Sequence, residues 1–102
     1  MTDLDSFIEI KNTRLVGNYP NPFNPETTIS FDLASDSPVL IEIFNIKGQQ
    51  IMTLVNNKYR SGYHNVIWNG TDQNNRPIVS GLYFCKMTTN EYSGVRRMIL
   101  MK

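Results

Sequence analysis

The chain has 102 residues, enough for one small domain. Hydrophobic residues make up 40% of it and the formal net charge is +1, a balance that suits a modest globular core and argues against a dedicated nucleic-acid binder. No apolar run approaches the roughly 20 residues that cross a bilayer, so we expect no membrane insertion. The acidic start Met1–Asp5 is unlike a signal peptide, which indicates a cytosolic chain or a mature or excised part of an exported protein.

The first residues carry only a weak strand signal. Residues 7–11 alternate apolar and polar side chains, so this segment is either an edge strand or the end of an interdomain linker.

An unusual proline-rich segment, Asn18–Pro25, follows. It holds three prolines, three asparagines and two aromatic residues. Proline at every second or third position excludes a helix and a central strand, and it pushes each preceding residue toward extended geometry. The pattern predicts a stiff entry segment ahead of the first regular strand, with Tyr19 and Phe23 covering one end of the fold. We assign a structural role to Asn21, Pro22, Phe23, Asn24 and Pro25.

Strand-like runs fill the rest of the chain, separated by turn residues at intervals of roughly 8–12 residues, which is typical of a sandwich. In the most apolar run, 39–44, Val39, Ile41 and Ile43 should face the core. Gly48 is expected to supply a turn, and Trp68 a core anchor, because a buried aromatic contributes the largest area in a small core. The expected strands are 27–33, 39–44, 49–55, 62–68, 80–87 and 92–101, with polar turns or loops at 34–38, 56–58 and 69–77.

The chain therefore has about seven strands, including one in its first 17 residues, and no helical crossover. This order favours antiparallel sheets packed face to face, an all-β sandwich.

Six short motifs stand in a fixed order along this pattern: Asn18–Pro25; Thr27–Ile29; Val39-x-Ile41-x-Ile43-Phe44-Asn45-x-x-Gly48; Gly62-Tyr63-His64-x-Val66-x-Trp68-Asn69-Gly70-x-Asp72; Ser80-Gly81-x-Tyr83; and Arg97-Met98-x-Leu100-x-Lys102. Together they resemble the C-terminal sorting domain of proteins exported by the type IX (Por) secretion system. They are also similar to the related immunoglobulin-like domain of the flagellar hook-capping protein.

The resemblance implies an immunoglobulin-like antiparallel β-sandwich of about seven strands over residues 15–102, at the end of a larger secreted protein. Residues 1–14 would be linker or an extra N-terminal strand. The domain would be a non-catalytic sorting signal without a cofactor. Its partners would be an upstream cargo domain and the outer-membrane export machinery, and it would pass through the periplasm to the cell surface or medium.

No residue pattern favours catalysis or metal binding. The only histidine, His64, has no nucleophile motif beside it, so we predict that it is a partly buried strand residue. Cys85 is expected on the same strand face as Tyr83 and Met87, so we predict a small core side chain rather than a reactive thiol. Residues 72–75 could supply oxygens to calcium but lack the bidentate glutamate of an EF-hand, so an Asx turn is the better account. Asn69-Gly70-Thr71 satisfies a glycosylation sequon but is also a strong turn signal.

Basic residues gather near the end of the chain, where Arg96 and Arg97 are joined by Lys86 and Lys102. These residues indicate either a solvated strand edge or a docking patch for the export machinery. Under the second reading, removal of the last strand should trap an attached cargo in the periplasm. The candidate binding residues are Gly81, Tyr83, Arg96, Arg97 and Lys102, with a purely structural role as the alternative for Tyr83.

A second function stays open beside sorting. A small sandwich with an extended N-terminal segment can donate a strand to a neighbour's sheet, so residues 4–12 could mediate self-association in a fibre or a hook-cap-like scaffold. Light scattering would distinguish the two, because a monomer at high concentration argues against self-assembly. A hydrolase is the least favoured of the three functions, because no residue pattern indicates catalysis.

Overall fold

The computed structural model describes residues 10–102, which form seven strands and no helix, so none of the described residues forms a helix able to span a membrane. This confirms the predicted all-β class. The strands are β1 (Arg14–Tyr19), β2 (Thr27–Leu33), β3 (Ser37–Phe44), β4 (Gln50–Tyr59), β5 (Gly62–Trp68), β6 (Gly81–Thr88) and β7 (Ser93–Leu100).

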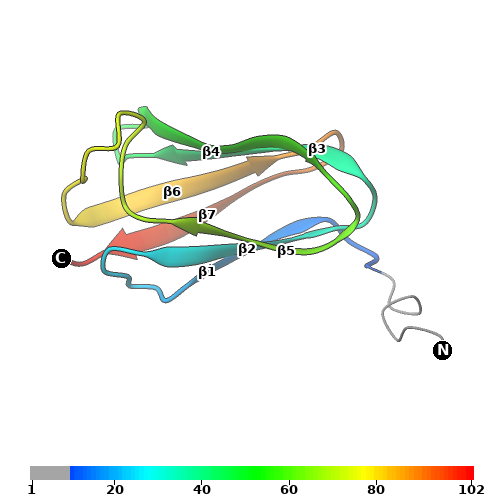
Figure 1. Ribbon diagram of the computed structural model, residues 1–102, viewed down its shortest axis with the longest axis horizontal. Coiled ribbons are helices and arrows are strands. Elements are labelled where there is room, and N and C mark those ends of the chain that lie inside the picture. Colours follow the sequence, from blue (N-terminus) through cyan, green and yellow to red (C-terminus); the bar gives the residue numbers. More distant parts are fainter. Residues whose placement is uncertain (1–9) are drawn as a thin grey trace.

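The strands form two antiparallel sheets packed face to face (Figure 1). One sheet has the order β1-β2-β5 and the other the order β4-β3-β6-β7. The result is an immunoglobulin-like sandwich in which β4 joins the sheet of β3, β6 and β7. The edge strands β1 and β7 lie next to each other along one side of the sandwich. They belong to different sheets and do not pair with each other.

The core lies between the sheets, as the period-two alternation predicts. On β3 the side chains of Val39, Ile41 and Ile43 are buried, while those of Leu40 and Glu42 point to the other face. Strand β5 repeats this pattern, because Trp68 at its end is only 1% exposed and its outward neighbours are exposed. The buried apolar side chains are Leu15, Phe23, Ile29, Phe31, Leu33, Val39, Ile41, Ile43, Val55, Trp68, Tyr83, Cys85, Met87, Met98 and Leu100.

Three predicted boundaries are wrong. Residues 37–38 are not part of the turn predicted at 34–38, because β3 begins at Ser37 and pairs with β4 from that residue on. The proline-rich segment does not precede the first strand: it connects β1 to β2, because β1 already spans Arg14–Tyr19. Residues 56–58 are not a loop, because β4 continues to Tyr59 and pairs along the full length of β3. Their polar side chains fit an exposed edge strand, where charge and polarity discourage unwanted pairing. Of the proposed N-terminal strand, residues 10–11 are not strand, and residues 7–9 lie outside the described part, as does most of segment 4–12.

Gly70, in the loop after β5, packs closely against the proline-rich segment. Its φ is +72°, and a Cβ added there would lie 2.7 Å from the backbone oxygen of Pro25. Gly48 has a similar φ of +80°, but a Cβ there would meet nothing within 4 Å. Gly70 thus carries both a conformational and a packing requirement, while Gly48 carries only the first.

We predict that Gly70→Ala lowers the free energy of unfolding by roughly 2–4 kcal/mol, and the matched control Gly48→Ala by only about 1 kcal/mol. The larger loss follows because the Pro25 carbonyl is backbone and must shift to admit a methyl group. Urea denaturation followed by circular dichroism measures both. Equal losses in the two variants would show that the close contact with Pro25 does not contribute to the loss of stability in Gly70→Ala.

Candidate interaction surface on the C-terminal strand

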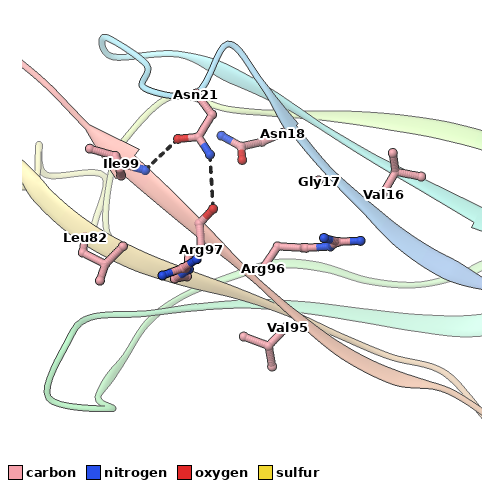
Figure 2. Close-up of a pocket in the computed structure, with 9 residues that line it drawn as sticks. All are labelled: Val16, Gly17, Asn18, Asn21, Leu82, Val95, Arg96, Arg97 and Ile99. Carbon is pink, nitrogen blue, oxygen red and sulfur yellow. Dashed lines mark hydrogen bonds between the residues drawn. The ribbon is translucent and has the colours of Figure 1, made fainter.

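Half of the β7 edge is covered by the proline-rich segment (Figure 2). The Asn21 side chain donates from Nδ2 to the Arg97 carbonyl (3.3 Å) and accepts at Oδ1 from the Ile99 N–H (2.9 Å). Phe23 then donates its N–H to the Ile99 carbonyl and accepts at its own carbonyl from the Met101 N–H, both at 2.9 Å. This backbone contact is a short parallel bridge between Phe23 and Leu100. The segment therefore acts as a partial extra strand that satisfies the outer groups of β7 from Arg97 to Met101.

The two aromatic residues of this segment differ in position. Phe23 is 2% exposed and packs against Trp68, with ring centroids 5.5 Å apart. Tyr19 is 83% exposed, so the prediction that it covers an end of the sandwich is wrong. It stands on the edge strand β1 paired with Thr28. The half-exposed Thr28 lies on the opposite face of β2 from the buried Ile29, so Tyr19 shares the solvent side of that sheet.

Tyr83 belongs to the core rather than to a surface. Its ring is 5% exposed and lies edge-on to Trp68, and its hydroxyl donates to the Val79 carbonyl four residues earlier, at 2.6 Å. Burial raises the pKa of this hydroxyl. A tyrosine near the start of the sixth strand that bonds back to the preceding loop is the tyrosine corner of immunoglobulin-like sandwiches. The Tyr83 side chain is therefore packed inside, which agrees with the structural role given as the alternative to binding.

The two adjacent arginines point in different directions because neighbours on a strand alternate between faces. Arg96 pairs with the buried Cys85 and reaches across to β1, where its Nε donates to the Leu15 carbonyl (3.1 Å). Arg97 pairs with Phe84 on the outer face, and its side chain makes no hydrogen bond or ion pair within residues 10–102. Arg96 therefore links the two sheet edges, while Arg97 is free to meet a partner.

The other candidate residues lie at the end of the sandwich where the chain leaves β7. Gly81 is exposed and pairs with Leu100. Lys102 is exposed, and its backbone N–H donates to the Ser80 hydroxyl (2.9 Å). Of the five predicted binding residues, Gly81, Arg97 and Lys102 are available on the surface, Arg96 is partly engaged, and Tyr83 is buried.

A groove of about 600 Å³ runs between the edges of β1 and β7 (Figure 2). Residues Val16–Asn18 form one side, and Val95–Arg97 with Ile99 form the other. Sequence reasoning missed the β1 side and the bonds of Asn21 to β7. The repeated asparagines beside proline were the only sequence signal for a structural role of these side chains. Nothing in the sequence places Asn21 next to Arg97.

The residues considered for chemistry have structural partners. His64 Nε2 lies 2.7 Å from the Arg60 carbonyl, and its ring stacks on Phe31. Asp72 Oδ1 accepts from the N–H groups of Asn74 and Arg76, which is the predicted Asx turn. Among residues 10–102, no three histidine, cysteine or acidic side chains gather where they could hold a metal ion.

Cys85 is 1% exposed, and burial raises the pKa of its thiol from 9.0 to about 12. The unfolded chain therefore loses this proton first as the pH rises. The contribution of the thiol to stability is complete below pH 9 and declines as the pH approaches 12.

We predict that the stability difference between the wild-type chain and Cys85→Ala shrinks between pH 8 and pH 11, because only the wild type has a buried thiol to ionise. Urea midpoints at both pH values measure the difference, and the lysines and tyrosines common to both chains cancel. A constant difference would contradict the buried-thiol account.

The family model described as the secretion system C-terminal sorting domain matches residues 18–101, from the end of β1 to the residue after β7. The chain belongs to this family. The match includes the proline-rich segment and the β7 edge that the segment covers. No curated protein matches the chain significantly.

Two solved structures share the fold. Latent dimeric PorU from Porphyromonas gingivalis superposes with a TM-score of 0.72 at 19% identity, over 93% of this chain. PorZ, a surface component of the type IX secretion system of the same organism, gives a TM-score of 0.59 at 19% identity, over 92% of this chain. The chain corresponds to only 10% of the PorU chain and 12% of the PorZ chain. These similarities support the immunoglobulin-like sandwich.

Proposed function

We propose that this domain is a non-catalytic sorting module of the type IX secretion system, which directs an attached cargo through the outer membrane to the cell surface or medium. The observation that carries the proposal is the family match over residues 18–101. The exposed Arg97 and Lys102 on the last strand and just after it support recognition of a folded surface by the export machinery.

The shape of the domain suits such a role. The described chain enters the sandwich at one end, and Lys102 leaves at the opposite end (Figure 1). A cargo domain placed before Ile10 would therefore lie away from Gly81 and Lys102. The machinery could then contact the C-terminal end of the sandwich while the cargo is still attached.

The test fuses a folded reporter to the N-terminus of this chain in a bacterium with a type IX system. The double variant Arg97→Gln, Lys102→Gln should accumulate in the periplasm, because it removes two exposed cations without touching the core. The matched control, Lys58→Gln with Arg60→Gln, removes the same charge from β4 and the connection to β5 and should be exported normally. Circular dichroism verifies that all variants are folded.

Two results would count against the proposal. If the reporter fused to the unaltered domain stays in the periplasm, the domain is not a sorting signal in that system. If both double variants are exported equally well, the basic residues at the end of the chain are not the recognised surface.

A further inference from the structure

The outward backbone groups of β7 divide into a covered half and an open half. Because Ile99 bonds the proline-rich segment through both its N–H and its carbonyl, the odd-numbered residues of β7 direct these groups away from β6. The groups from the Arg97 carbonyl to the Met101 N–H are covered. The Arg97 N–H and both backbone groups of Val95 and of Ser93, the first residue of β7, remain. Within residues 10–102, no strand pairs with them and no loop bond reaches them.

The open half lies along the groove beside β1, and its surroundings are basic with an apolar rim (Figure 2). Val95 is 56% exposed and Ile99 is 42% exposed, so both present apolar surface to the groove. Arg96 and Arg97 flank them, and among the described residues neither forms an ion pair. Arg96 already donates from Nε to the Leu15 carbonyl, whereas the Arg97 guanidinium has no partner among the described residues. A free guanidinium favours a carboxylate, which can accept two parallel hydrogen bonds from it.

The chain itself shows how a backbone docks on this edge. Phe23 adds to β7 in parallel, opposite Leu100. One step further along the strand the contact passes from backbone to side chain, because the Asn21 amide, and not its peptide group, bonds the Arg97 carbonyl. The added strand thus ends at Asn21, and the next positions of β7 stay open for another extended segment.

We propose that the open half of the β7 edge, from Val95 to Arg97, binds an extended acidic segment of a partner protein by strand addition. Backbone hydrogen bonds to Val95 and the Arg97 N–H provide the pairing, and carboxylates facing Arg97 provide the selectivity. The identification of this partner with the export machinery rests on the proposed function. The preference of the groove for an acidic strand does not.

The probe is a blocked hexapeptide that alternates valine with glutamate, titrated into the ¹⁵N-labelled 102-residue chain. Its control is the same peptide with lysine in place of glutamate. We expect amide shifts at Val95, Arg97 and Gly17 with the acidic peptide alone, and a decline in affinity with added salt.

Two pairs of variants separate backbone pairing from charge. Val95→Pro removes an outward N–H at an edge position where proline is tolerated, and it should weaken binding about tenfold. Val95→Thr keeps the N–H and should bind like the wild type. Arg97→Gln should weaken binding several-fold, about the loss expected for one charge-assisted hydrogen bond, and Arg60→Gln, which removes a charge away from the groove, should not.

The proposal is overturned if both peptides bind equally, if Val95→Pro binds as well as Val95→Thr, or if inorganic phosphate alone produces the same amide shifts. Reporter export distinguishes this failure from failure of the proposed function. Normal export without peptide binding would reject only the acidic strand, whereas peptide binding by a domain that exports no reporter would reject only the sorting role.

Discussion

Trp68→Ala should lower the free energy of unfolding by about 3–5 kcal/mol, a large part of the 5–15 kcal/mol typical of a domain. Trp68 is the largest buried side chain and joins three parts of the fold. It ends β5, contacts Phe23 of the proline-rich segment, and meets the ring of Tyr83 on β6 at a centroid distance of 6.1 Å. Its removal therefore leaves a cavity and also withdraws the support of Phe23.

The measurement is urea denaturation followed by circular dichroism, because Trp68 is the only tryptophan and fluorescence is lost with it. Trp68→Phe is the matched control. It keeps an aromatic ring but loses the hydrogen bond from Nε1 to the Thr71 carbonyl, so about 1–2 kcal/mol should be lost. Hydrogen exchange at Ile99 and Met101 should accelerate in the alanine variant as the covering segment loosens. Unchanged exchange would show that Phe23 is held independently of Trp68.

Removing residues 98–102 should abolish cooperative folding. Met98 and Leu100 are both buried, at 0% and 1% exposure, and their loss removes about 4–10 kcal/mol of packing, comparable with the whole stability of a small domain. The truncation also deprives Phe23 of the bonds to Ile99 and Met101. Near-ultraviolet circular dichroism and a denaturant titration would measure the loss.

A deletion of the last strand therefore removes the fold together with any recognised surface. A cargo trapped after such a deletion could lack either the address or the fold, so the deletion alone cannot identify a recognised surface. Removal of Lys102 alone is the informative control. It leaves both buried side chains and should change stability by less than about 0.5 kcal/mol. A cooperative, native-like transition in the longer truncation would contradict the assignment of β7 to the core.

The strand pattern was largely predictable because burial of one sheet face imposes a period of two. The predicted strand 27–33 coincides with β2, and the inward positions of β3 are as expected. The larger errors fall on the edge strands β1 and β4. Residues 56–58 look like a loop because an edge strand such as β4 can be polar. The opposite facing of Arg96 and Arg97 was also within reach, since the same period of two separates neighbours on a strand.

Alternation, turn residues and short motifs are local properties, and they were enough to predict the class of fold, the family and the inward positions of β3. The three-dimensional structure was needed to show that the proline-rich segment covers part of the β7 edge, that Tyr83 is buried, and that the Arg97 side chain, unlike that of Arg96, has no partner among the described residues. Asn21 and Arg97 are 76 residues apart, and their contact depends on the packing of one sheet on the other. Such contacts have no local signal, because they follow from the closure of the whole sandwich.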